Sequence, residues 1–170
     1  LAVAGGVESM TRAPLVMGKA EVAFQRSAEV FDTTIGWRFI NPVMKKLYGV
    51  DSMPETAENV AAEHGISRAD QDAFALRSQH RAGRAQAEGY FEGEIVPVEL
   101  KDSRGNVTLF RQDEHARAAT TAEQLARLKP IVRPDGTVTA GNASGVNDGA
   151  AALVLANAAA VKAHGLTPMV

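Results

Sequence analysis

The sequence predicts an α/β fold in which helices and short strands alternate along the chain. Three observations lead to this prediction. Apolar runs that are rich in β-branched residues and bounded by turn residues indicate strands. Serine or threonine followed three residues later by an acidic residue indicates helix starts. The composition of the 170 residues, of which 45% are hydrophobic and 22% are charged, is typical of a globular chain.

Strands are predicted near both ends of the chain and in its middle. Leu1–Ala4 is a short apolar run that indicates a buried strand. Residues 94–100 and 107–110 flank a turn-rich stretch, so they are expected to pair as a hairpin, with Pro97 placing the first strand at a sheet edge. Residues 150–155 are small and apolar, and this pattern fits either a buried helix or a strand.

Helices are predicted from their boundary residues. The expected ranges are about 56–64, 67–88, 120–128 and 158–164. Ser67 with Asp70, and Thr120 with Glu123, form the pattern of a capping box. Residues 14–50 have no clear period and are expected to form a packed, loop-rich segment with short helices.

The 67–88 helix carries small and apolar residues at spacings of three or four. This spacing predicts a narrow buried stripe along one face of the helix. The residues of the stripe are Ala73, Leu76, His80, Gly83 and Ala87.

Charge and composition exclude several classes of protein. The net charge of −2 lacks the basic excess of a nucleic-acid-binding protein. The absence of cysteine excludes disulfides, zinc–thiolate sites and a cysteine nucleophile within these residues. The four histidines do not cluster, so no metal site is expected. The longest apolar run, residues 150–156, is too short to cross a membrane, and we expect a cytoplasmic protein without membrane contacts.

The two ends of the chain are both apolar. The chain begins at Leu1 rather than methionine, and it closes on the apolar pair Met169-Val170 after a turn. We expect these residues to be a fragment of a longer protein.

The glycine-rich stretch 139–152 is the most distinctive part of the sequence. Its glycines allow close approach to the backbone, and its Asn, Ser and Asp side chains could direct polar groups at a ligand. The alternative is close packing of small residues, with Asn and Asp satisfying the backbone of a turn. The residue types alone leave both interpretations open.

Five blocks of sequence together resemble the thiolase family. They are AGGVESM at 4–10, TAENVA at 56–61, SRADQDAFA at 67–75, EIVP at 94–97 and the stretch 137–152. The blocks follow the order and spacing of that family and span nearly the whole chain. Residues 32–39 and 50–55 further resemble the 3-oxoadipyl-CoA thiolase subfamily, in the degradative branch.

The resemblance implies an αβαβα layered core with an α+β loop domain inserted in its N-terminal half. Residues 1–13 would end a core strand and its following turn. Residues 14–140 would form the loop domain that binds coenzyme A. Residues 141–170 would return to the core and begin the connection to the C-terminal half.

The resemblance also implies an acyltransferase reaction. Thiolases transfer an acyl group from 3-oxoacyl-CoA to coenzyme A through an acyl-cysteine, with release of acetyl-CoA. The nucleophilic cysteine, the catalytic histidine and a second cysteine would all lie outside this chain. No catalytic residue is therefore expected within it, and the chain alone should be inactive.

By the same resemblance, this chain would supply contacts to coenzyme A. The corresponding residues are Ser144, Gly145, Arg117, Met53, Leu128 and Ala140. Ser144 and Gly145 match a turn on the pantetheine arm, and Arg117 matches an arginine near the adenine. A solvated loop charge is the alternative for Arg117, and core packing is the alternative for Met53 and Leu128.

Coenzyme A and acyl-CoA would be substrates, and no cofactor is expected. The resemblance implies that the full-length protein is a homodimer or homotetramer. The competing hypothesis, which the lack of cysteine favours, is a non-catalytic module that binds acyl-CoA or mediates assembly.

Overall fold

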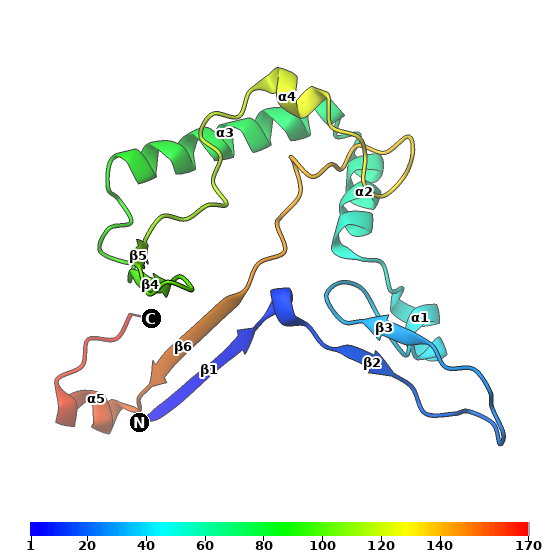
Figure 1. Cartoon of the computed structure of the whole chain (residues 1–170), viewed down its shortest axis with the longest axis horizontal. Coiled ribbons are helices and arrows are strands. Elements are labelled where there is room, and N and C mark those ends of the chain that lie inside the picture. Colours follow the sequence, from blue (N-terminus) through cyan, green and yellow to red (C-terminus); the bar gives the residue numbers. More distant parts are fainter. Residues whose placement is uncertain (170) are drawn as a thin grey trace. The chain divides into compact units, whose positions relative to one another are not determined.

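The computed structural model describes residues 1–169 and confirms the predicted mixture of helices and strands (Figure 1). The chain divides into two compact units. One unit contains residues 1–50 and the C-terminal segment that starts at Val146, and the other is Asp51–Gly145. No helix within residues 1–169 is both long enough and apolar enough to cross a membrane.

The first unit is built on a two-stranded antiparallel ribbon. Strand β1 (Ala2–Glu8) pairs with β6 (Gly149–Leu155). The strand alternative for residues 150–155 is therefore confirmed, and β1 is longer than predicted. Gly5 is required at this pairing, because a Cβ there would lie 2.5 Å from the carbonyl oxygen of Ala151.

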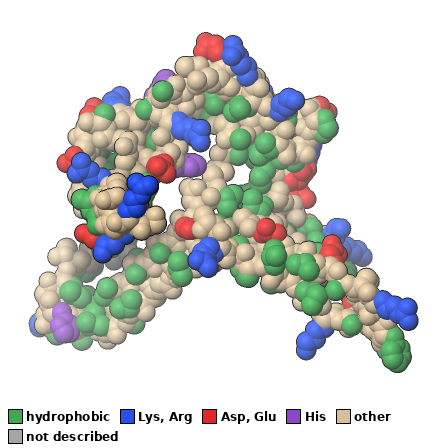
Figure 2. Space-filling model, in the orientation of Figure 1, with side chains coloured by type: hydrophobic (Ala, Val, Ile, Leu, Met, Phe, Trp, Pro, Cys, Tyr) green, Lys and Arg blue, Asp and Glu red, His purple; other side chains and the backbone are tan. Residues whose placement is uncertain are grey.

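Both faces of the β1–β6 ribbon are apolar and exposed, so the expectation that residues 1–4 are buried is not met within this chain. Val3 is 78% exposed and Val154 is 68% exposed. Figure 2 shows hydrophobic side chains along this ribbon. Apolar residues on both faces are typical of strands in a sheet that is covered on both sides. An isolated two-stranded ribbon, by contrast, is only marginally stable.

Shorter elements complete the first unit. They are the 3-10 helix η1 (Met10–Arg12), strands β2 (Leu15–Met17) and β3 (Val30–Asp32), and helices α1 (Pro42–Tyr48) and α5 (Ala158–His164). Strands β2 and β3 pair antiparallel to each other. The predicted short helix at 158–164 is confirmed, with Asn157 as its N-cap and Gly165 in the left-handed conformation after it.

Asp148 clamps the start of β6 to the turn that follows β1. Its carboxylate accepts a hydrogen bond from the Thr11 backbone N–H at 2.9 Å and another from the Thr11 hydroxyl at 2.8 Å. These hydrogen bonds hold the pKa of Asp148 below its usual value.

Asp148→Asn is expected to destabilise the protein at neutral pH. The difference in stability between the variant and the unmodified protein should shrink in acid. A carboxylate with a lowered folded-state pKa stabilises the fold above its unfolded pKa, near 3.8. That stabilisation is lost as the pH falls through the folded-state value. The test compares the urea midpoints of the unmodified protein and of Asp148→Asn. Both are measured at neutral pH and again at a pH below the folded-state pKa of Asp148. An equal difference at both pH values would contradict the role of this carboxylate.

The second unit contains three helices and a hairpin. The helices are α2 (Met53–His64), α3 (Arg68–Ala87) and α4 (Ala122–Ala126), and the hairpin joins β4 (Val98–Lys101) to β5 (Val107–Phe110). The predicted hairpin is confirmed, although its first strand begins later than expected. Helix α2 begins before the predicted residue 56, because Ser52 caps it and Pro54 is tolerated in the first turn.

The two predicted capping boxes differ from those in the structure. At α3, Ser67 accepts a hydrogen bond from the Asp70 N–H, but the Asp70 carboxylate accepts from the Ser67 hydroxyl rather than from the backbone. At α4, the box is Thr121 with Gln124, one residue later than predicted. The hydroxyl of Thr120 donates instead to the carbonyl of Arg117. Thr121 is therefore the N-cap, and the helix starts at Ala122.

The predicted buried stripe of α3 is largely wrong. Of its five members only Gly83 is buried, whereas Ala73, His80 and Ala87 are exposed. The buried face instead contains Asp72. The helix turns this face inward because Gly83 fits closely against Ala118, with 3.0 Å between a Cβ placed on the glycine and the Ala118 Cα.

The loop-domain boundaries rest on the resemblance alone. They lie at residues 13/14 and 140/141, whereas the compact units are divided near residues 50 and 145. The predicted boundaries stay predictions.

Candidate functional site

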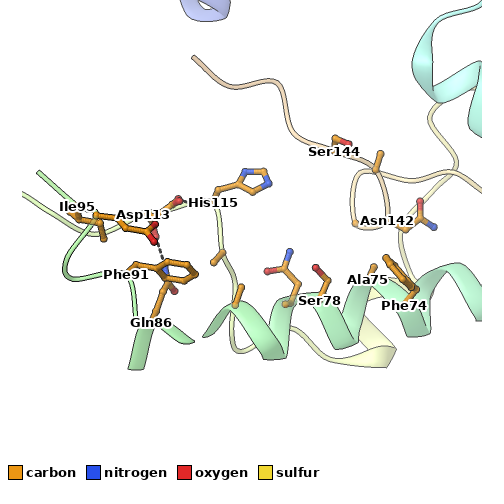
Figure 3. A pocket seen from close by; sticks show the side chains of 16 residues that line it. Phe74, Ala75, Ser78, Gln86, Phe91, Ile95, Asp113, His115, Asn142 and Ser144 are labelled. Atoms are coloured by element: carbon orange, nitrogen blue, oxygen red, sulfur yellow. Dashed lines mark hydrogen bonds between the residues drawn. The ribbon is translucent and has the colours of Figure 1, made fainter. Parts of the chain in front are cut away.

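A groove of about 680 Å³ lies beside α3 within the Asp51–Gly145 unit. Four segments line it: α3, the turn before β4, residues 113–116 and residues 141–144. Figure 3 shows Phe74, Ala75 and Ser78 projecting from α3, with Asn142 and Ser144 on the segment that faces the helix. The groove therefore combines aromatic and aliphatic walls with hydroxyl and amide groups, two carboxylates and one histidine.

The turn that carries Ser144 is fixed by its own hydrogen bonds. The Asn142 side chain accepts a hydrogen bond from the Thr139 N–H at 2.8 Å, and the Thr139 hydroxyl accepts from the Gly141 N–H at 3.2 Å. The Thr139 carbonyl accepts from the N–H of Ala143 at 3.0 Å. Thr139 itself is fully buried. These short-range bonds follow the pattern of Asn and Thr in turns.

Both interpretations of the glycine-rich stretch find support in this turn. A Cβ on Gly141 would lie 2.5 Å from Leu128 Cδ1 and 2.6 Å from Leu125 Cδ2, which shows close packing. Asn142 satisfies the backbone of the turn. Ser144, by contrast, is exposed and lines the groove, so its hydroxyl is available to a ligand.

Glu58 anchors the chain just before this turn. Glu58 is only 4% exposed, and its carboxylate accepts hydrogen bonds from the Val138 N–H at 2.8 Å and from the N–H and hydroxyl of Thr137. Burial opposes ionisation of Glu58, but the bonds from Val138 and Thr137 outweigh it and lower the pKa. The sequence analysis missed this residue, because nothing in the helical period distinguishes a buried glutamate from an exposed one.

A second polar contact supports the same segment. Arg133 forms an ion pair with Glu55 on α2 and donates a hydrogen bond to Asn59 at 2.6 Å. Helix α2 thus holds the 133–138 segment at several points.

Of the six predicted contact residues, one lines the groove, four adjoin residues that line it, and one does neither. Ser144 lines the groove, Gly145 follows it in the chain, and Ala140 and Leu128 adjoin Gly141. Arg117 follows the lining residue Ala116, and its backbone N–H donates to Gln79 Oε1 at 2.7 Å. Met53, at the start of α2, is 78% exposed and is not among the lining residues.

The groove contains groups that sequence reasoning missed. They are Phe74 and Ser78 on α3, Phe91 and Ile95 before β4, and Asp113. Their positions depend on how the segments pack, and no local motif distinguishes them. The His115 ring extends into the space between α3 and the 141–144 segment (Figure 3).

One acidic side chain of the groove is hydrogen-bonded within its own segment. The Asp113 carboxylate accepts from the backbone N–H of His115 at 2.9 Å, so it is engaged in its own turn. Within residues 1–169, no group of three or more His, Asp or Glu residues could hold a metal ion. The groove offers apolar side chains, the hydroxyl groups of Ser78 and Ser144, the carboxylates of Glu94 and Asp113, and the His115 ring.

Comparisons with known proteins connect this chain to one family. The family profile described as "Thiolase, N-terminal domain" matches residues 1–159. The beta-ketoadipyl-CoA thiolase of Pseudomonas aeruginosa is 67% identical over 168 residues, which cover 99% of this chain and 42% of that protein. The 3-oxoadipyl-CoA/3-oxo-5,6-dehydrosuberyl-CoA thiolase of Escherichia coli K12 is 62% identical over the same length and coverage.

A solved structure agrees with these sequence matches. The crystal structure of human mitochondrial 3-ketoacyl-CoA thiolase in complex with CoA is 40% identical, with a TM-score of 0.73 over 98% of this chain and 40% of that chain. This chain spans about 42% of the length of the curated relatives it matches. The predicted thiolase fold is confirmed, and the chain belongs to the thiolase family.

Proposed function

We propose that these residues form the coenzyme A-binding part of a longer thiolase that acts on 3-oxoacyl-CoA. The observation that carries this proposal is the position of Ser144, exposed on a fixed turn beside a largely apolar groove. The human relative was solved with CoA bound, which supports the same ligand here.

The chemistry of the groove suits the pantetheine arm of coenzyme A. That arm is long and uncharged, with amide and hydroxyl groups along it. A groove walled by Phe74, Phe91 and Ile95 would cover its apolar atoms, while Ser144 would meet a polar one. Arg117 would lie toward the nucleotide, where a guanidinium can pair with phosphate or stack on a base.

The full-length protein would carry out the acyl transfer in two steps. A cysteine thiolate attacks the 3-oxo carbon, the bond between C2 and C3 breaks, and acetyl-CoA leaves once its carbanion is protonated. The thiol of a second coenzyme A then takes the acyl group and releases the cysteine. By family resemblance, this cysteine, the second cysteine that protonates the carbanion and the catalytic histidine would lie outside the present chain.

The names of the relatives favour 3-oxoadipyl-CoA as the substrate. Coenzyme A would be a substrate together with 3-oxoacyl-CoA in the thiolysis direction, and no cofactor is proposed. We further propose a cytoplasmic homodimer or homotetramer.

Ser144→Ala in the full-length protein is expected to raise the KM for coenzyme A about tenfold, with a smaller effect on kcat. Removing one hydrogen-bonding partner from a bound polar group costs about 1–3 kcal/mol, and 1.4 kcal/mol corresponds to a factor of ten. Thiolysis kinetics with varied coenzyme A measure this change.

Ser103→Ala is the matched control, since Ser103 is exposed in the turn of the β4–β5 hairpin and does not line the groove. An unchanged KM in Ser144→Ala would overturn the proposed contact. Coenzyme A binding without any thiolysis by the full-length protein would favour the competing hypothesis, a non-catalytic binding module.

A further inference from the structure

We propose that Arg68, Asp72 and Asn142 form a positioning network that orients the Ser144 turn for coenzyme A. This inference rests on the proposed function, because it assigns how the binding turn is held rather than what it binds. None of the three residues is proposed to touch the ligand.

Asp72 connects helix α3 to the turn. Its Oδ1 accepts a hydrogen bond from the Asn142 side-chain amide at 3.0 Å. Asp72 is buried, with 9% of its surface exposed, so this bond lies largely out of water. Charged hydrogen bonds of this kind are stronger than neutral ones.

The Asn142 amide is restricted to one orientation. Its Oδ1 accepts from the Thr139 N–H at 2.8 Å, and its Nδ2 donates to both Asp72 and the Thr137 carbonyl, each at 3.0 Å. A flipped amide would lose all three bonds. Asn142 therefore requires an acceptor, and not a donor, at position 72.

Arg68 extends the network to the end of α4. Its Nε donates to Asp72 Oδ2 at 2.7 Å, and its Nη2 donates to the carbonyls of Leu125 at 2.7 Å and Leu128 at 3.1 Å. Leu125 lies in the last turn of α4 and Leu128 just beyond it, and the Leu125 carbonyl also accepts from the Leu128 N–H at 3.0 Å. Arg68 thus ties Leu128, itself a predicted ligand contact, to the same helical turn as Asp72.

The two branches of the network meet at Gly141. The side chains of Leu125 and Leu128 pack on Gly141, the residue before Asn142 in the turn. One side of the turn is held by the Asp72–Asn142 bond, and the other is held by leucines whose carbonyls bind Arg68. Since Ser144 is two residues beyond Asn142, a shift of this turn moves its hydroxyl relative to the groove.

Asp72→Asn in the full-length protein is the direct test. The new amide can accept from Arg68 only by presenting its NH₂ group to the Asn142 amide, which places two donors face to face. We expect the Kd for coenzyme A, measured by calorimetry, to rise about tenfold, in line with the loss of a charge-assisted hydrogen bond. The Michaelis constant should rise in parallel, with a smaller change in kcat.

The double variant Asp72→Asn/Asn142→Asp provides a rescue that a purely structural role would not predict. The amide at 72 then donates to the carboxylate at 142, which still accepts from the Thr139 N–H. The bond to the Thr137 carbonyl and the charge of the Arg68–Asp72 ion pair are lost, so coenzyme A affinity should recover in part. This variant also keeps the test decisive if Asp72→Asn alone folds poorly.

Asp70→Asn is the matched control, because it also removes a negative charge from α3, and the Asp70 carboxylate hydrogen-bonds to Ser67 rather than to the Ser144 turn. It should leave the Kd unchanged. A Kd in Asp72→Asn equal to that of the control, or a double variant no better than the single one, would overturn the network.

Coupling to Ser144 separates this inference from the proposed function. If Asp72→Asn misplaces Ser144, adding Ser144→Ala should weaken binding less than it does in the unmodified protein. Fully additive losses would refute the positioning role while leaving the Ser144 contact intact. No effect of Ser144→Ala in either background would instead count against the proposed function.

Discussion

Glu58→Ala is expected to lower the free energy of unfolding by about 3 kcal/mol, the sum of its lost hydrogen bonds to Val138 and Thr137. The backbone N–H groups of these residues would lose their acceptor in a poorly solvated place. Gly136 lies against the same carboxylate, where a Cβ would be 3.0 Å from Glu58 Cδ. The change should loosen the chain that leads into the Ser144 turn.

Glu63→Ala is the control, since Glu63 is on the same helix but is exposed. Chemical denaturation of the full-length protein at neutral pH measures both variants. The loss of unfolding free energy for Glu58→Gln should lie between the losses for Glu58→Ala and Glu63→Ala, because the glutamine amide keeps one acceptor oxygen. A loss no larger for Glu58→Ala than for Glu63→Ala would contradict the anchoring role of Glu58.

Gly83→Val is expected to destabilise the protein by about 2–3 kcal/mol, at the upper end of overpacking costs. A Cβ on Gly83 would collide with the Cβ of Ala118 and lie 3.0 Å from its Cα, so the backbone must move. Ala118 follows Arg117, whose N–H is bound to Gln79 on the same helix. The substitution should therefore separate this loop from α3.

Ala87→Val tests whether the helix itself tolerates valine, because Ala87 is exposed near the end of α3. Gly83→Ala should cost less than Gly83→Val, since alanine gains about 1 kcal/mol of helix propensity over glycine. Thermal unfolding of Gly83→Val, Gly83→Ala and Ala87→Val gives the order of their stabilities. A stabilised Gly83→Val protein would show that the loop moves aside freely.

The helix ends could largely be predicted because their causes are local. Ser67 caps α3 within three residues of the backbone group it binds, and Gly65 ends α2 in the left-handed conformation. Such contacts depend on the adjacent sequence and on no other part of the fold. The shift of the α4 box from Thr120 to Thr121 shows the limit, since two adjacent threonines offer equal local signals.

The candidate site was predicted unevenly. Ser144 lies in a block of sequence that identifies the family, and the structure places it at the groove. Phe74 lies in another such block, but its sequence does not show that it faces the same groove. The coenzyme A contacts predicted for all six residues, Ser144 included, stay predictions.

The sequence by itself determined the family, the mixed fold class and the positions of most helices, because motif blocks and capping residues act over short distances. Only the tertiary structure decided which face of α3 is buried and which polar groups are joined. Glu58 and Val138 are 80 residues apart, and Asp72 and Asn142 are 70 residues apart. Contacts over such separations depend on how helices pack, and a helix that carries small residues on several faces does not specify this choice.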